Sequence, residues 1–164
     1  MRILSSRFMI SIALAVGIAL CDQWVKIRIV DYFQQGQPTI PLTPFWTIIL
    51  TWNHGISFGL LQGIIGRWVL SAIGLLITGG LLVWLKHAQT QLQALSLGLI
   101  IGGAIGNLID RFWHGAVVDY LLFHSHGFYF PAFNIADAAI SIGVALLFYE
   151  HFLLSSSKAS TRKR

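Results

Sequence analysis

Long apolar runs, separated by shorter segments, dominate the chain. Four runs could cross a membrane as helices, because a bilayer core needs roughly 20 consecutive apolar residues per helix. They are residues 8–29, 64–85, 92–109 and 135–154. The segments between them are too short for a separate soluble domain. The pattern therefore predicts an all-α membrane protein, with a single four-span domain over residues 1–154 and a disordered basic tail over residues 155–164.

Two of the connecting segments are rich in aromatic and β-branched residues and carry a different pattern. Residues 47–52 are typical of a short strand, and residues 116–123 and 128–130 are interpreted as a hairpin that turns at residues 124–127. Aromatic side chains are enriched at membrane interfaces. We therefore expect a small extracytoplasmic β element and loops that rest on the interface.

Basic residues indicate the orientation of the spans. Those that flank the spans on one side are Arg2, Arg7, Lys86, Lys158, Arg162, Lys163 and Arg164. The other side has the connections 30–63 and 110–134, in which Arg111 is the only Lys or Arg. Because Lys and Arg are in excess in short cytoplasmic loops, we expect both termini in the cytoplasm and the aromatic connections outside.

Composition supports the membrane class and argues against other classes. The chain is 55% hydrophobic and 10% charged, whereas a soluble domain carries about 25% charged residues. The formal charge of +5 does not indicate a nucleic-acid partner, because the basic residues are not gathered with aromatic residues on one face. The single cysteine, Cys21, has no partner for an internal disulfide, and we expect it to act as a small hydrophobic residue.

The acidic residues supply the main functional signal. Of the six in the chain, four lie at or near the outer ends of predicted spans: Asp22, Asp110, Asp119 and Asp137. A charge at the bilayer centre costs about 2.5–3.5 kcal/mol on insertion scales, so an ionisable residue in a span is a functional candidate by default. The sequence therefore predicts a polar site close to the outer leaflet.

Asp22 and Lys26 lie one helical turn apart in the first span, with the acid first, which favours an ion pair. One interpretation is a structural pair that lets two charges share a membrane environment. The other is that Asp22 holds Lys26 so that its ammonium group faces the carboxylates of the site. The sequence alone leaves both open.

The third span combines a small-residue stripe with polar residues. Gly98, Gly102 and Gly106 are spaced by four, which predicts close helix packing. Asn107 and Arg111 continue beside this stripe, so we expect Asn107 to point inward. Asp110 is adjacent to Arg111, and a structural ion pair between them is one interpretation.

Asp119 lies in an apolar strand just before the fourth span, and Asp137 lies in the first turn of that span. Asn134 is a good N-cap, and an acid in the first turn suits the helix dipole, so capping alone explains Asn134 and Asp137. Two nearby carboxyls, however, also supply the base and the acid that peptide hydrolysis needs. Our hypothesis is that Asp137 is the ionised base and Asp119 the protonated partner.

Three other chemistries are weaker. Residues 55–59 match G-x-S-x-G, but a nucleophile elbow needs an α/β sheet that this chain cannot build. A dyad of Ser57 and Lys26 remains chemically possible. The histidines of the outer connections do not form a metal-binding motif, so we do not expect a metal site there.

Five short motifs, taken together, resemble the bacterial lipoprotein signal peptidases, which are intramembrane aspartyl proteases. In order, they are Asp22-Gln23, Asn53-x-Gly55-x-x-Phe58-Gly59, Gly102-Gly103-Ala104-x-Gly106-Asn107-x-x-Asp110-Arg111, Val118-Asp119-Tyr120 and Phe133-Asn134-x-Ala136-Asp137. Each motif is short, but five in the same order over nearly the whole chain are specific. His54, Ile56 and Ser57 look atypical for the family.

The resemblance implies catalytic roles for Asp119 and Asp137. It implies supporting or substrate-binding roles for Asp22, Lys26, Asn53, Gly55, Asn107, Asp110, Arg111 and Asn134. It also implies a monomeric enzyme of the bacterial inner membrane without metal or cofactor. Its substrates would be prolipoproteins, cleaved immediately before a diacylglyceryl-modified cysteine at the outer leaflet. Residues 53–63 would form a flap over the substrate.

A small transporter or assembly factor is the rival interpretation, with the acids and Arg111 on a proton or ion path. Such a path should continue through the bilayer. The inner halves of spans two to four hold little that is polar beyond Thr78 and Ser96. The sequence therefore favours a site that opens to one side.

Overall fold

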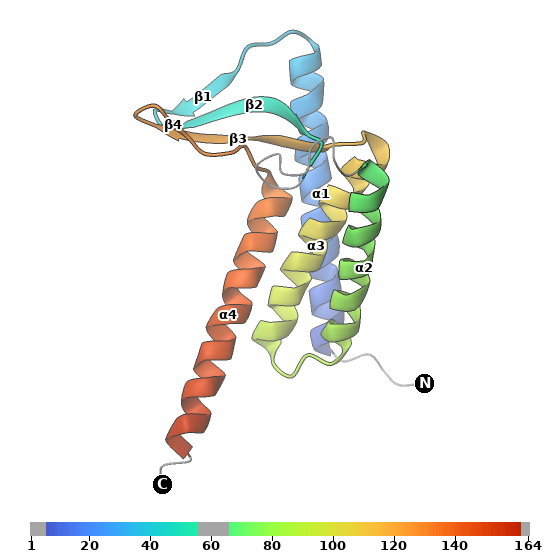
Figure 1. Ribbon diagram of the computed structural model, residues 1–164, viewed down its shortest axis with the longest axis vertical. Helices are drawn as coiled ribbons and strands as arrows, with labels where there is room; N and C mark the ends of the chain where they lie inside the picture. Colours follow the sequence, from blue (N-terminus) through green and yellow to red (C-terminus); the bar gives the residue numbers. More distant parts are fainter. Residues whose placement is uncertain (1–5, 56–65, 162–164) are drawn as a thin grey trace.

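Four long helices form the body of the molecule, and a small sheet covers one end (Figure 1). The computed structural model describes residues 6–55 and 66–161. The helices are α1 Ser6–Gln34, α2 Arg67–Lys86, α3 Gln91–Trp113 and α4 Ile135–Thr161. Each is long and apolar enough to cross a membrane. The predicted spans and fold class are confirmed, and we call the end that bears the sheet the outer end.

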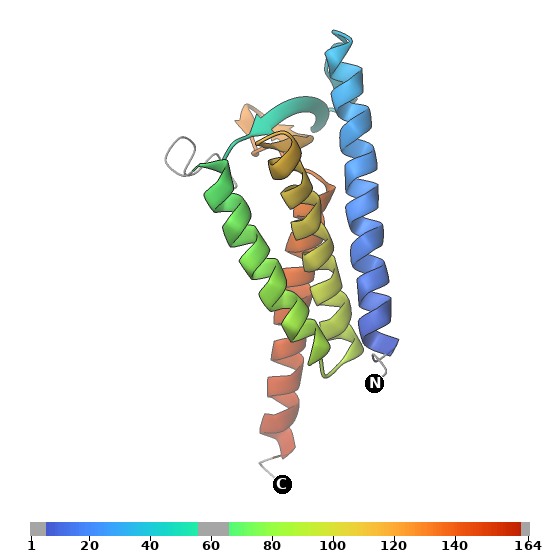
Figure 2. The same cartoon turned by 90° about the vertical axis from the view of Figure 1, so that its right-hand side faces the viewer.

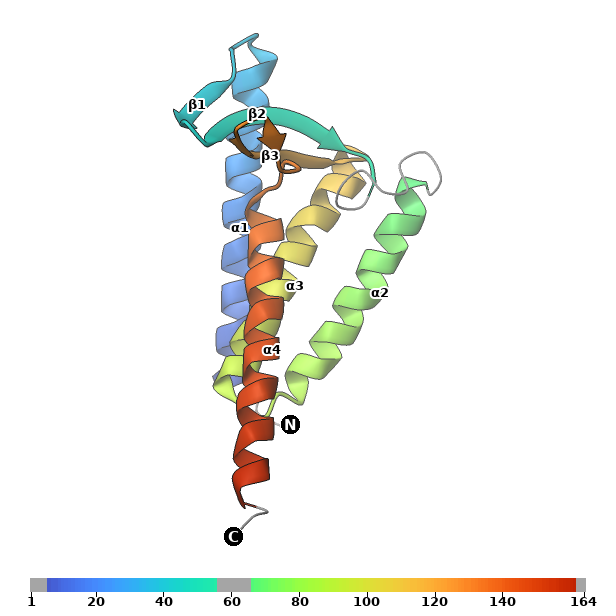
Figure 3. The ribbon, with the colours of Figure 1, turned by 60° about the vertical axis from the view of Figure 1, so that its left-hand side comes forward.

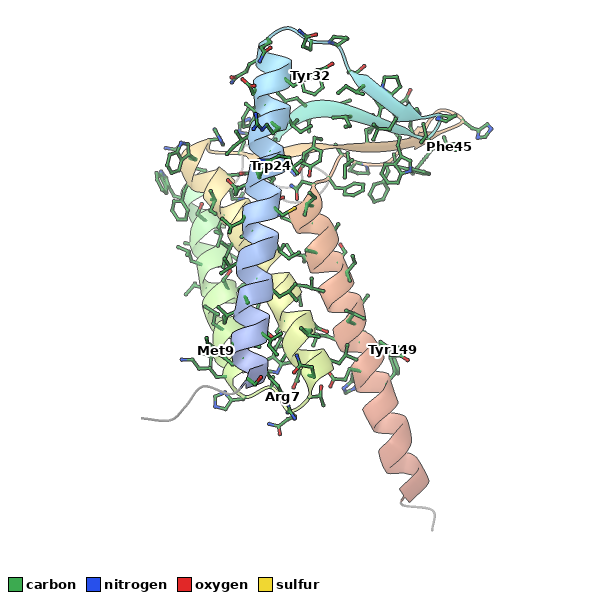
Figure 4. The ribbon with its side chains drawn as sticks, turned by 180° about the vertical axis from the view of Figure 1, so that it is seen from behind. Arg7, Met9, Trp24, Tyr32, Phe45 and Tyr149 are labelled. Carbon is green, nitrogen blue, oxygen red and sulfur yellow. The ribbon has the colours of Figure 1, made fainter. Side chains whose placement is uncertain are left out.

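Helix α3 lies at the centre of the bundle, with α1, α2 and α4 around it (Figure 2). Its N-cap is Thr90, whose hydroxyl oxygen accepts a hydrogen bond of 3.0 Å from the Gln93 amide. Apolar side chains near the inner ends of α1, α2 and α3 form the buried core. By contrast, Met9 and Trp24 of α1 point away from the bundle and are more than half exposed (Figure 4). These exposed apolar faces are suited to lipid.

The predicted glycine stripe brings α3 against its neighbours. A Cβ added at Gly98 would lie 2.8 Å from the Ser11 carbonyl oxygen, and one at Gly102 would lie 2.7 Å from that of Ala15. At Gly106 the nearest atom, at 2.6 Å, would be a carboxylate oxygen of Asp22. The packing prediction is confirmed, and the absence of side chains there lets α1 carry Asp22 to the centre of the bundle.

The sheet is antiparallel, with the order β1-β2-β3-β4. Its strands are β1 Ile40–Thr43, β2 Trp46–Asn53, β3 Val117–Ser125 and β4 Phe128–Tyr129. The predicted strand at residues 47–52 and the hairpin are confirmed. The turn is tighter than predicted, because His126 and Gly127 adopt positive φ values of 48° and 84° and β3 extends through Ser125. Strand β1 was not predicted, since it is short and contains Pro41.

Three helices extend several residues beyond the predicted spans, and one of them is α3, which continues from the predicted end at residue 109 to Trp113. Helix α1 continues to Gln34, into the connection that we interpreted as a loop, and carries the chain above the sheet (Figure 1). Helix α4 continues to Thr161, past the predicted end of the membrane domain at residue 154. The division into a domain over 1–154 and a disordered tail over 155–164 stays a prediction. The pairing of β2 with β3, which joins the two outer connections, is the contact that positions the site.

Candidate active site

Asp119 lies in the buried first half of β3, opposite Thr51 of β2, and its side chain is 2% exposed. Two asparagines hold its carboxylate. Asn53 Nδ2 donates to Oδ2 at 3.0 Å, and Asn134 Nδ2 donates to Oδ1 at 2.7 Å. The strand pairing thus places a carboxyl group away from water with a donor on each oxygen.

Asp137 lies in the first turn of α4. The Asn134 amide donates to its Oδ2 at 3.3 Å, while its own amide donates to Asn134 Oδ1 at 2.9 Å, so the two residues form a reciprocal cap. Asn107 Nδ2 of α3 donates to the other oxygen of Asp137 at 2.8 Å. The capping interpretation is therefore correct for Asn134 and Asp137, but it does not exhaust their contacts.

Asn134 joins the two acids. Its side-chain nitrogen contacts Asp119, and its backbone amide and side-chain oxygen contact Asp137. One buried residue therefore holds the carboxyl groups of a strand and a helix against the same cleft. Asp119 and Asp137 thus both line this cleft, and their catalytic roles stay a prediction.

Burial, and after it the neighbouring charge of Asp137, raise the pKa of Asp119 from 3.8 to about 6. Hydrogen bonds from Asn53 and Asn134 oppose the increase without cancelling it. Removal from water disfavours the charged form of a carboxyl group. Asp119 therefore holds a proton more readily than an ordinary aspartate does.

The orientation of the Asn107 amide is determined by its neighbours. Lys26 Nζ donates to Asn107 Oδ1 at 3.1 Å, and Asn134 Nδ2 donates to the same oxygen at 3.2 Å. With both donors on the oxygen, the Asn107 nitrogen faces Asp137. Lys26 thus acts on Asp137 through Asn107.

Lys26 also forms the centre of a buried charge cluster. Its ammonium group lies 2.8 Å from a carboxylate oxygen of Asp22 and 2.8 Å from one of Asp110, and its side chain is 2% exposed. The other oxygen of Asp22 accepts from the Ala136 amide at 3.0 Å, and Asp110 accepts from the Val118 amide at 3.0 Å. The cluster ties α1 and α3 to the two segments that carry Asp119 and Asp137.

These contacts decide two alternatives. Both interpretations of Asp22 and Lys26 hold in part, because the two residues form an ion pair and Lys26 reaches the site through Asn107. The ion pair that Asp110 forms in the described part of the chain is with Lys26. The interpretation that paired the Asp110 carboxylate with Arg111 is therefore wrong, because that carboxylate pairs with Lys26. Arg111 Nη2 instead donates to the Gly55 carbonyl at 3.4 Å.

Gln23 completes the cluster, and sequence reasoning left it out of the site. Its Nε2 donates to Asp110 Oδ1 at 2.8 Å and to the Gly106 carbonyl at 3.1 Å. The available signal was an uncharged polar residue next to Asp22 in an apolar span. Asn53 has a second contact of its own, because its Oδ1 accepts from the Gly55 amide at 3.0 Å.

A cleft of about 730 Å³ opens beside the two acids. Asn53, Arg111, Asp119 and Asp137 lie at its polar end, and apolar residues of α2, α3 and α4 continue it toward the inner side. Helix α2 leans away from α4 toward the outer end, where this cleft lies (Figure 3). Ser57, and residues 56–63 of the predicted flap, lie outside the described residues. The cleft offers two carboxyls to a substrate with an apolar segment.

A polar dyad at the head of an apolar membrane cleft is the arrangement of an intramembrane hydrolase, and comparisons with known proteins agree. The family model for signal peptidase (SPase) II matches residues 14–153. The chain is 42% identical to a lipoprotein signal peptidase of Burkholderia vietnamiensis over 142 residues, 85% of each protein. It is 42% identical to that of Nitrobacter hamburgensis over 151 residues, 87% of this chain and 91% of the relative.

Two solved structures, both bacterial membrane enzymes determined by the in meso method, share the fold. One, at 2.3 Å resolution, has a TM-score of 0.79 and 28% identity, covering 90% of each chain. The other, at 1.9 Å, has a TM-score of 0.69 and 30% identity, covering 85% of this chain and 90% of the other. The chain belongs to the signal peptidase II family, and the resemblance seen in its motifs is confirmed.

Proposed function

We propose that this protein is an aspartic endopeptidase that removes signal peptides from prolipoproteins, cutting immediately before a diacylglyceryl-modified cysteine. The observation that carries the proposal is the bridge through Asn134, which holds Asp119 and Asp137 together at the head of an apolar cleft. Membership of the signal peptidase II family supports the substrate class.

In the proposed mechanism, Asp137 takes a proton from water while Asp119 donates a hydrogen bond to the scissile carbonyl oxygen. Asp137 lies at the start of α4, where the helix dipole attracts negative charge. The raised pKa of Asp119 suits it to the protonated role. Water then adds to the carbonyl carbon, and the tetrahedral intermediate collapses as the amide C–N bond breaks and the leaving amine takes the proton that Asp137 removed from water.

The cleft suits a substrate that stays in the membrane. Its apolar walls, formed by residues such as Ile73, Ile77 and Ile140, would receive the signal peptide, while Asn53 and Arg111 would contact the backbone near the scissile bond. The lipid on the cysteine would remain in the outer leaflet. This arrangement corresponds to a monomer in the bacterial inner membrane with both termini in the cytoplasm.

The test is a gel-shift assay of a lipid-modified precursor with wild type, Asp119→Asn and Asp137→Asn. Each variant keeps side-chain shape but loses the acid–base group, so cleavage should slow by about 10³-fold. Asp31→Asn, which removes an exposed acid of α1, is the matched control and should cleave at the wild-type rate. Unchanged cleavage by either dyad variant would refute the proposal.

A further inference from the structure

A second cavity, of about 460 Å³, lies at the inner end of the molecule, far from the acids of the cleft. Its lining comes from the end of α2, the connection of α2 to α3, the start of α3 and the inner half of α4. Its polar lining includes Thr90, Gln93 and Glu150, and its apolar lining includes Trp84, Val144 and Phe148. The proposed peptidase mechanism uses none of these residues.

Glu150 is the chemical feature of this cavity. Its side chain is 7% exposed, and the Thr90 hydroxyl donates to its Oε1. Over residues 6–55 and 66–152, Glu150 forms no ion pair with a Lys or Arg, unlike the acids paired with Lys26. A carboxylate that leaves water without a cation is costly. The cavity therefore has a place for a positive group beside Glu150.

The apolar walls indicate where the occupant comes from. Trp84 is 46% exposed and Phe148 is 61% exposed, and both belong to helices that could span a membrane. A ligand that reaches these side chains comes from the bilayer and has an apolar chain.

A second charge lies close by. The Arg7 guanidinium donates to the Gln89 carbonyl, and Gln89 lines the cavity. Arg7 lies at the inner end of α1, and Tyr149, on the inner part of α4, precedes Glu150 (Figure 4). Glu150 in the cavity and Arg7, which is hydrogen-bonded to a lining residue, complement a zwitterion with its ammonium at Glu150 and its phosphate toward Arg7.

We propose that this cavity binds one phospholipid with a primary ammonium headgroup, of the phosphatidylethanolamine class. Its acyl chain would lie along Trp84, Val144 and Phe148, and its ammonium group would donate to Glu150. An anionic headgroup would be repelled by Glu150, and a trimethylammonium group has no N–H to donate. The bound lipid would hold the inner half of α4 against the connection between α2 and α3.

The test is native mass spectrometry of the full-length, delipidated protein in detergent. It is incubated with equal amounts of phosphatidylethanolamine, phosphatidylcholine and phosphatidylglycerol that carry the same chains. One phosphatidylethanolamine should be retained with about tenfold preference over the other two, since a charge-assisted hydrogen bond is worth roughly 1.5–3 kcal/mol. Glu150→Gln should abolish the preference, and the matched carboxylate variant Asp31→Asn should keep it.

Val144→Trp provides a second test of lipid binding, because the larger side chain fills the apolar part of the cavity and leaves Glu150 unchanged. It should lose the retained lipid yet cleave a lipoprotein precursor normally, and it decides the question if Glu150→Gln fails to fold. Asp119→Asn should retain the lipid, which separates this proposal from the peptidase assignment. Equal retention of the three lipids, or unchanged retention by Val144→Trp, would overturn the proposal.

Discussion

Buried polar side chains have different kinds of partner in the outer and inner halves of the helix bundle. In the outer half, Lys26 joins Asp22 and Asp110 across two helices, and backbone amides complete the cluster. In the inner half, the Thr78 and Ser96 hydroxyls donate to carbonyl oxygens four residues earlier in their own helices. Polar side chains thus link elements within the outer half, whereas these two hydroxyls stay within their own helices. The inner contacts between elements, Thr90 with Glu150 and Arg7 with Gln89, lie at the connection of α2 to α3.

This difference also bears on the transporter interpretation. A proton or ion path needs polar groups that continue from one side to the other. In the described helices, the cluster around Lys26 and the Asn134 bridge lie in the outer half, and apolar residues such as Leu97 and Ile101 fill the core of the inner half. The geometry favours a site that is served from one leaflet.

Replacing Lys26 should lower the stability of the protein more than any other change considered below. Lys26→Met leaves Asp22 and Asp110 buried without their cation, so the free energy of unfolding should fall by about 3–5 kcal/mol. Arg28→Met, two residues along α1, removes an exposed cation whose guanidinium lies 5.8 Å from the Trp24 ring centroid and should cost less than about 1 kcal/mol. Denaturation in mixed micelles compares the two, and equal losses would contradict the buried cluster.

The pH dependence of stability should reveal Asp119. Its pKa is about 6 in the folded protein against an ordinary value of 3.8, so the folded state binds the proton more tightly. Proton binding by Asp119 therefore stabilises the folded protein by on the order of 3 kcal/mol. This stabilisation is fully present below pH 4 and is lost as the pH rises through about 6.

Asp119→Asn should remove that loss. Thermal unfolding of both proteins from pH 4 to pH 7 measures this effect. The stability of the wild type should fall as the pH rises, and that of the variant should not. Parallel curves for the two proteins would mean that Asp119 titrates as an ordinary surface acid.

A methyl group at Gly102 tests the close packing of α1 against α3. Gly102→Ala places Cβ 2.7 Å from the Ala15 carbonyl oxygen, so α1 must shift, at a cost of about 1–3 kcal/mol. Gly79→Ala, where nothing lies within 4 Å, should be neutral or slightly stabilising. The same micelle denaturation assay checks both, and an equal response at the two glycines would argue against tight packing of α1 on α3.

The smallest effect is expected in the inner half. Thr78→Val removes a hydroxyl whose 2.7 Å hydrogen bond goes to Gly74 in the same helix, so stability should change by no more than about 0.5 kcal/mol. A loss comparable to that of Lys26→Met would show that the inner half also depends on polar contacts. The contrast between the halves would then fail.

Local patterns predicted most of the architecture because each span carries its own signal. Apolar length identified the four helices, and the glycine spacing identified the face of α3 that approaches α1. The end of α1 at Gln34 was missed, because polar residues follow the apolar run and hydrophobicity no longer marks the helix. Strand β1 was missed because Pro41 weakens its signal.

The site was less predictable because it is assembled from distant segments. Rare acids pointed to Asp119 and Asp137, and family motifs pointed to their asparagine partners. Neither could show that Asp110 would pair with Lys26, 84 positions away, rather than with its neighbour Arg111. The pairing of β2 with β3 was equally hidden, since no local pattern encodes which strands meet.

The contact between Asp22 of the first helix and the Ala136 amide of the last has a consequence for biogenesis. During synthesis, α4 leaves the ribosome after the other three helices, and it carries Asp137 with it. A nascent chain with three inserted helices therefore lacks one carboxyl of the proposed pair and leaves Asp22 without its amide donor. Under the proposed mechanism, a chain truncated before α4 should be inert toward the precursors around it in the membrane.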